Sequence, residues 1–232
     1  MREILQTGFD KMGIPWDDEK INRLEKYAKL LVEWNEKMNL TAITDTEGIA
    51  VKHFLDSAAA LTTGKIKGRV IDVGTGAGFP GMVIKILRPE LNVTLLDGHA
   101  KRFIFLEDLQ AKLGLSTKNL HIRAELAAKD SSYREAFDYA TARAVARLNT
   151  LCEYCLPFVK KGGKFIAMKG PGAEEELTEA KRAIGILGGK NEKLILEKLP
   201  EDNTRNFIVV EKLLSTPEKY PRASAKISKN PL

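Results

Sequence analysis

The chain has 232 residues, of which 44% are hydrophobic and 29% charged, a composition typical of one sizeable globular domain with an appendage. It holds no apolar run of about 18 residues that could cross a bilayer, and its polar, amphipathic start is unlike a signal peptide, so we expect a cytoplasmic protein. The formal charge of +6 is unevenly placed: residues 1–60 carry net −3 and residues 215–232 carry net +3. A polyanionic partner would bind the central and C-terminal parts more readily than the acidic N-terminal part. An ordinary basic surface explains the charge equally well.

The first sixty residues are expected to be helical. Between positions 17 and 37 apolar residues recur at steps of three and four, which is typical of one face of an amphipathic helix. These residues are Ile21, Leu24, Tyr27, Leu30, Leu31 and Trp34. A second helix is predicted over 46–61 and a short one over 1–11. We therefore expect a helical cap over residues 1–63, with Trp34 in its core.

After Gly64 the pattern changes to apolar strands that alternate with helices. Such alternation predicts right-handed βαβ units and a parallel sheet with helices on both faces. Two later strands are separated by a link too short for a parallel crossover, so an antiparallel hairpin is predicted at the end of the sheet. This α/β domain is expected to span residues 64–214, followed by a basic, loop-like tail over 215–232. The expected strands cover 69–73, 92–97, 119–124, 137–143, 164–170, 192–199 and 206–213.

A glycine-rich turn follows the first of these strands, in the sequence DVGTGAGFPG (72–81). Gly74, Gly76 and Gly78 allow left-handed backbone conformations and a close approach to a ligand. A helix predicted to start near Pro80 would add free N–H groups. The turn therefore predicts a mononucleotide-type ligand.

The residues around this turn favour S-adenosylmethionine over a nicotinamide dinucleotide. GAGFPG (76–81) matches the dinucleotide fingerprint G-x-G-x-x-G, which by itself does not separate one adenosine ligand from another. Asp72 would favour a cationic ligand over a pyrophosphate, and Phe79 is bulky where a pyrophosphate needs close backbone approach. Asp97, at the end of the second strand, is placed to accept hydrogen bonds from a ribose diol. A nicotinamide-dependent oxidoreductase stays open as an alternative.

Cys152 and Cys155 form a CxxC pair, but the sequence supplies neither a second pair nor histidines at zinc-ligand spacing. Their neighbours keep helical spacing, so we interpret both cysteines as packing residues and expect no metal site.

Several motifs carry a resemblance over essentially the whole chain: WNEKMNLTAI (34–43), KHFLDS (52–57), DVGTGAGFPG (72–81), TARAVARL (141–148), MKGP (168–171) and the tail YPRASAKISKNPL (220–232). With these motifs the chain resembles the bacterial small-subunit ribosomal RNA methyltransferase G family, also called glucose-inhibited division protein B. The resemblance implies a class I, Rossmann-like S-adenosylmethionine-dependent methyltransferase that modifies a guanine N7 in 16S ribosomal RNA. The chain departs from the family pattern at Ala225 and Ile227, where glycine and proline are expected.

The resemblance also implies site residues. Carried over position by position, cofactor contacts fall on Gly74, Phe79, Ala124, Glu125 and Arg143. Guanine N7 carries a lone pair and no proton, so no general base is required and alignment can supply most of the acceleration.

The target guanine must still be held near the cofactor. The candidates for positioning it or its RNA are His53, Asp56, Lys169 and Arg222. The expected partner is small-subunit ribosomal RNA or a ribosomal particle. We expect the protein to act as a monomer, without a metal and without a membrane. A non-catalytic RNA-binding or ribosome-assembly protein on the same fold stays open as a second alternative.

Overall fold

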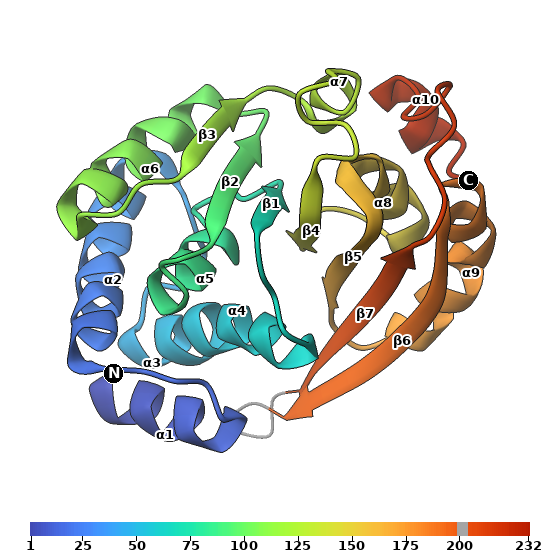
Figure 1. Cartoon of the computed structure of the whole chain (residues 1–232). Helices are drawn as coiled ribbons and strands as arrows, with labels where there is room; N and C mark the ends of the chain where they lie inside the picture. The colour runs from blue at the N-terminus through green and yellow to red at the C-terminus, as the bar shows by residue number, and fades with distance from the viewer. Residues whose placement is uncertain (199–203) are drawn as a thin grey trace.

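A computed structural model describes residues 1–198 and 204–232 and shows a twisted sheet with helices on both faces (Figure 1). The strand order is β3-β2-β1-β4-β5-β7-β6. The first five strands run parallel, and β7 pairs antiparallel with both β5 and β6. The predicted mixed sheet with a C-terminal hairpin is therefore confirmed. The strands are β1 (Arg69–Val73), β2 (Asn92–Asp97), β3 (Lys118–His121), β4 (Phe137–Arg143), β5 (Val159–Lys169), β6 (Gly189–Lys198) and β7 (Thr204–Lys212).

The helices form two layers with separate apolar cores. The N-terminal helices, α5 and α6 bury one face of the sheet, and α8 and α9 bury the other. Within β1, Val70 belongs to the first core and Ile71 to the second, because successive side chains of a strand point to opposite faces. The helices are α1 (Arg2–Met12), α2 (Asp18–Met38), α3 (Thr46–Gly48), α4 (Asp56–Ala58), α5 (Gly81–Leu87), α6 (Ala100–Leu113), α7 (Ala124–Ala127), α8 (Leu148–Cys155), α9 (Ala173–Ile186) and α10 (Ser224–Lys229).

The N-terminal region is helical, as predicted. The expected second helix is one continuous helical stretch from α3 to Thr63, with π-helical geometry over Ile49–Leu55 and 3₁₀ geometry over Ala59–Thr63. Trp34 is partly buried between α2 and α6, where its indole N–H donates to Asp108 at 2.8 Å. These helices share the core of the sheet, so they are packed onto the α/β domain over a large area.

Three predicted strand boundaries are wrong by three residues or more, and one of them is at β6, which begins at Gly189 and not at position 192. The strand expected over 119–124 ends at His121, and Ala124 already begins α7. The strand expected over 164–170 begins earlier, at Val159, where two lysines and two glycines hide its alternation. The link expected between the last two strands lies largely at 199–203, outside the described residues.

The tail is not wholly loop-like, because α10 forms over Ser224–Lys229. Ile227 anchors this helix, with 0% of its surface exposed. Ala225 and Ile227 replace the glycine and proline that the resemblance predicts, and both residue types favour a helix far more than those do. The departure from the family pattern therefore agrees with the helix.

Cys152 and Cys155 are free thiols buried in the second core, as their helical spacing predicts. Burial raises the pKa of both thiols, so they stay protonated at neutral pH. In residues 1–198 and 204–232 we find no cluster of side chains suited to a metal ion. Among these residues no helix combines the length and the apolar character needed to span a membrane.

Candidate functional site

A pocket of about 780 Å³ lies at the carboxyl edge of the parallel strands. It opens where the strand order reverses between β1 and β4, the position at which open α/β sheets bind ligands. The glycine turn after β1 forms its floor, and the ends of β2 and β4, the start of α7 and the tail helix α10 form its walls. The fold therefore brings together segments that are far apart in the sequence.

The three glycines of the turn, Gly74, Gly76 and Gly78, have different surroundings. All three have positive φ, at 75° for Gly74, 60° for Gly76 and 98° for Gly78. Gly74 and Gly76 line the pocket, whereas Gly78 faces the core, where an added Cβ would lie 2.6 Å from the Tyr27 hydroxyl oxygen. The expected ligand contact at Gly78 is therefore replaced by a packing role, because α2 crosses directly over that position.

Asp72 does not lie on the pocket wall, although its charge suggested contact with a cationic ligand. It is fully buried, and one carboxylate oxygen accepts hydrogen bonds from the Thr75 hydroxyl at 2.6 Å and the Gly81 N–H at 2.8 Å. Burial raises the pKa of Asp72 to about 6, although these hydrogen bonds act to lower it. The carboxylate therefore ties the turn to the start of α5.

Replacing Asp72 with asparagine is expected to remove a pH dependence of stability. The folded state holds this proton more tightly than the unfolded chain, so the contribution of Asp72 to stability is greatest below pH 4 and falls as the pH rises through 6. A shift of about two units corresponds to about 3 kcal/mol. Urea unfolding of both proteins between pH 4.5 and 7.5 should show the wild type losing stability relative to Asp72→Asn as the pH rises. Parallel curves would contradict the assignment.

Asp97 lies on the pocket wall at the end of β2, where it was expected. One carboxylate oxygen accepts the Gly76 N–H at 3.0 Å and the Arg102 guanidinium at 2.7 Å, and the other accepts the His99 N–H at 2.9 Å. Burial alone would raise the pKa of Asp97, but these hydrogen bonds hold it below its usual value. Asp97 is therefore an ionised acceptor at neutral pH, joined to the glycine turn.

Replacing Asp97 with alanine is expected to weaken S-adenosylmethionine binding by about 1–3 kcal/mol, because a hydroxyl of the ribose loses a charged acceptor. Titration calorimetry with the wild-type protein and Asp97→Ala gives the two dissociation constants. Glu107→Ala, at an exposed position of α6 outside the pocket lining, is the control and should bind like the wild type. Equal S-adenosylmethionine affinity of all three proteins would show that Asp97 does not hold the ribose.

An aromatic stack borders the pocket on the side of the N-terminal helices. The Phe79 ring stacks on Tyr27, with centroids 5.2 Å apart, and on His53, with centroids 4.5 Å apart. His53 lines the pocket from the π-helical turn, a geometry that is often found at functional sites. Burial and the neighbouring Arg143 lower the pKa of His53 to about 4, so its imidazole is uncharged at neutral pH.

Arg143 lines the pocket at the end of β4, with its guanidinium 4.9 Å from the Phe79 ring centroid. Its Nη1 pairs with Asp56 at 2.9 Å. Asp56 is 0% exposed and also pairs with Arg205 on β7. Asp56, expected to contact the target, therefore does not line the pocket; it lies behind the wall and holds Arg143 in place.

Ala124 and Glu125 line the pocket from the first turn of α7, with Glu125 only 7% exposed. The other two expected target contacts do not reach the pocket wall. Lys169 donates to the Ala146 carbonyl at 2.6 Å and pairs with Glu176 at 2.7 Å. Arg222 pairs with Glu153 at 2.6 Å. Both side chains hold neighbouring segments that do line the pocket.

The structure also adds pocket residues that sequence reasoning missed. A loop after β4 contributes Ala144, which has a positive φ of 54°, and Val145, which is 41% exposed. Thr41 accompanies His53, with its hydroxyl 2.8 Å from Nε2. Thr41 lies within one of the family motifs and Ala144 within another, so the motifs were a signal for both. Further additions include Leu40, His99, Arg102, Arg123, Ala146, Thr150, Tyr154, Ser224 and Ser228.

The residues of this pocket fit S-adenosylmethionine. Asp97 can hold the ribose diol, the positive-φ turn at Gly74 and Gly76 admits close backbone approach, and Arg143 can hold the carboxylate of the amino-acid part. The hydrogen bond from Gly76 to Asp97 fixes the first two of these groups relative to each other.

Solved structures with the same fold are methyltransferases. A methyltransferase from Pyrococcus furiosus superposes with a TM-score of 0.55 at 16% identity, covering 83% of this chain and 99% of that one. A SAM-dependent O-methyltransferase from Thermotoga maritima gives 0.52 at 16% identity, covering 81% and 72%. At this identity the likeness concerns the fold, which is that of the class I S-adenosylmethionine-dependent methyltransferases.

Sequence comparison is more specific. The family described as rRNA small subunit methyltransferase G matches residues 20–206. A ribosomal RNA small subunit methyltransferase G from Alkaliphilus metalliredigens is 48% identical over 99% of this chain and 98% of its own length. The protein of the same name from Acetivibrio thermocellus is 51% identical over 100% of this chain and 97% of its own length. The chain therefore belongs to the rRNA small subunit methyltransferase G family.

Proposed function

We propose that this enzyme transfers the methyl group of S-adenosylmethionine to a guanine N7 in small-subunit ribosomal RNA. The observation that carries the proposal is one continuous pocket that joins the Asp97 and glycine-turn side to the His53 and Arg143 side. The first side suits an adenosine cofactor, and the second offers an aromatic stack and a fixed cation beside it. Cofactor and base can therefore meet within one pocket.

The bound cofactor would supply an electrophilic methyl group on a sulfonium. The work left to the protein is alignment, because N7 attacks with a lone pair and releases no proton. His53 is suited to such a site as an uncharged ring held by Thr41 and Phe79. It would border the base without repelling the positive charge that develops on it. Arg143, held by Asp56, lies 3.4 Å from Nδ1 at the other edge of the His53 ring.

The acceptor guanine must be unpaired or turned out of its helix. In an A-form RNA helix the major groove that displays N7 is too deep and narrow for protein side chains to reach. We therefore place the target in a loop or a distorted segment of the RNA. We expect the enzyme to act as a monomer, and the ribosomal RNA substrate implies a cytoplasmic site of action.

The test is incubation of the protein with methyl-labelled S-adenosylmethionine and small-subunit particles, or their RNA, that lack the modification. Label at the N7 of a single guanine is the expected result. Cofactor binding without transfer to either acceptor would favour the non-catalytic alternative. Label on another atom or on another RNA would contradict the proposed target while leaving the methyltransferase reaction in place.

A further inference from the structure

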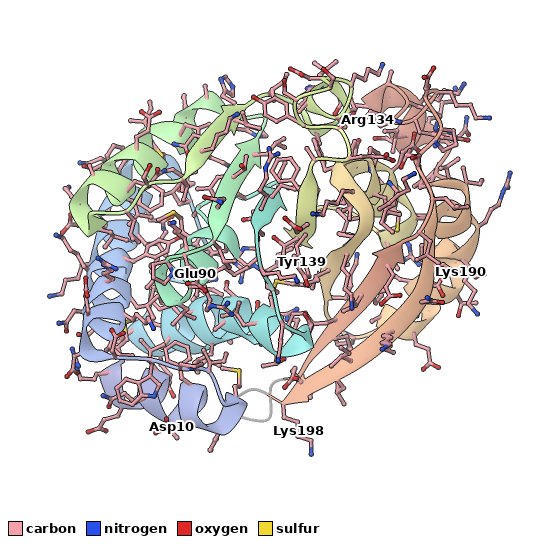
Figure 2. The ribbon with its side chains drawn as sticks, viewed as in Figure 1. Asp10, Glu90, Arg134, Tyr139, Lys190 and Lys198 are labelled. Atoms are coloured by element: carbon pink, nitrogen blue, oxygen red, sulfur yellow. The ribbon has the colours of Figure 1, made fainter. Side chains whose placement is uncertain are left out.

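The C-terminal segment 215–232 is fixed firmly to the methyltransferase domain. Arg134, labelled in Figure 2, donates to the backbone carbonyls of Thr216 at 2.7 Å and Tyr220 at 2.9 Å. Glu153 on α8 is 0% exposed and accepts hydrogen bonds from the Arg222 backbone N–H at 2.8 Å and from its guanidinium at 2.6 Å. Charge-assisted hydrogen bonds of this kind are among the strong ones in proteins. The tail therefore has a defined place.

This place puts α10 at the mouth of the pocket. The Ser224 hydroxyl lies 3.1 Å from the Tyr154 hydroxyl of α8, and the Ile227 side chain is buried. Ser224 and Ser228, four residues apart and so on one face of the helix, both line the pocket. Helix α10 is thus one of the pocket walls.

The remaining charges of α10 point away from the pocket. At 100° per residue, Lys226 and Lys229 lie on the face turned away from Ser224 and Ser228. Both lysines are exposed, and neither forms a salt bridge with any residue of 1–198 or 204–232. The positive charge of Arg222, in contrast, is neutralised by Glu153. Two uncompensated cations therefore stand beside the entrance.

The rest of the entrance has the same sign of charge. The side chains of Arg102 and Arg123 line the pocket and are 41% and 68% exposed. The lining holds two acidic residues, Asp97 and Glu125, whose side chains are only 3% and 9% exposed. Arg102 and Arg123 pair with these two carboxylates at 2.7 Å and 3.8 Å, and the arginines are the more exposed partners. The charge that reaches the solvent at the mouth is therefore mainly positive, an arrangement complementary to a polyanion that passes over it.

We propose that α10 is a docking element for the phosphate backbone of the RNA substrate, with Lys226 and Lys229 contacting phosphates next to the target guanine. This inference rests on the proposed function and assigns a partner to a surface outside the cofactor contacts. The two lysines supply affinity and register, because phosphate contacts position a protein on RNA without reading its sequence. They leave cofactor binding untouched, since they face away from the pocket.

The experiment compares Lys226→Ala/Lys229→Ala with a control pair, Lys65→Ala/Lys67→Ala. The control lysines are exposed and precede β1, so they lie at the edge of the sheet opposite the pocket. Binding to unmodified small-subunit ribosomal RNA is measured at several salt concentrations. For the tail pair we expect affinity lower by about tenfold or more near 0.1 M salt, and a slope of log affinity against log salt reduced by about 1.4 for two lost phosphate contacts.

Affinity for S-adenosylmethionine and thermal unfolding are measured on the same proteins and should match the wild type, which shows that both variants are folded. Equal RNA affinity of the two variant pairs would overturn the inference, and so would an unchanged salt slope in the tail variant. The proposed function fails separately, through the absence of methyl transfer by the wild-type protein in the same RNA preparation.

Discussion

Replacement of Asp56 by alanine is expected to lower the free energy of unfolding by about 3–5 kcal/mol. Asp56 is 0% exposed and is the carboxylate partner of both Arg143 and Arg205, whose side chains are only 14% and 25% exposed. Removal of the acid leaves two guanidinium groups close together in a poorly solvated place. Losing one partner of a buried pair costs far more than losing a surface pair, because the remaining charge is left without compensation.

The same substitution is expected to lower methyl transfer by about 100-fold, since a displacement of about 1 Å at a reacting centre has effects of this size. Arg143 lines the pocket and its Nη2 lies 3.4 Å from His53 Nδ1, so a shift of the guanidinium changes the surface offered to the target base. Asp56→Asn keeps the shape and one acceptor and should fall between wild type and alanine.

Urea denaturation and single-turnover methyl transfer measure the two effects of Asp56→Ala. The matched control is Asp18→Ala, which also removes a carboxylate from an arginine pair, but one in which the Asp18 side chain is 82% exposed. That exposed pair should contribute no more than about 1 kcal/mol. If Asp56→Ala destabilises the protein no more than Asp18→Ala does, Asp56 is not the anchor of Arg143.

The parts of the fold that follow from local patterns could be predicted from the sequence. The sheet was predictable because strands buried on both faces give short apolar runs, and a short link forces an antiparallel pair. Asp97 was predictable because the parallel strands meet at one edge, which brings the end of β2 beside the turn after β1. In both cases the position of the residue follows from the order of the strands in the sheet.

The roles of Asp72, Asp56 and Gly78 could not be predicted in this way. An aspartate that contacts a ligand and an aspartate that supports the turn from behind give the same sequence pattern. They differ in which side chains from distant segments face them, such as Thr141 for Asp72 and Arg205 for Asp56. The motifs that carry the family resemblance contain these positions, but a motif does not distinguish contact with a ligand from support of a neighbour.

The tail shows a second limit of sequence reasoning. Its prolines and low apolar content favour an irregular segment, yet Glu153 and Arg134 supply the tertiary contacts that hold it. Ile227 is the one buried residue of α10, and a single buried residue in a short helix leaves no periodic signal.

The two glycines on either side of Ala77 are expected to separate stability from cofactor binding. Gly78→Ala should lower the free energy of unfolding by about 2–5 kcal/mol, the sum of about 1–2 kcal/mol for a left-handed residue and about 1–3 kcal/mol for overpacking. Its new methyl group would lie 2.6 Å from the Tyr27 hydroxyl oxygen and 2.9 Å from Met82 Cγ. Tyr27 has little freedom to yield, because its hydroxyl donates to the Ala77 carbonyl of the same turn.

Gly76→Ala should behave differently, although the glycine has a positive φ of 60° and stands two residues away in the same turn. An added Cβ at Gly76 meets nothing within 4 Å, so only the backbone term of about 1–2 kcal/mol applies to stability. The methyl group instead projects toward the ligand space that Gly76 lines, and S-adenosylmethionine affinity should fall by about tenfold or more. Urea midpoints and calorimetric titration of both variants test this pair. If Gly78→Ala binds the cofactor more weakly than Gly76→Ala while being the more stable of the two, the division of the turn into a ligand-facing and a core-facing glycine is wrong.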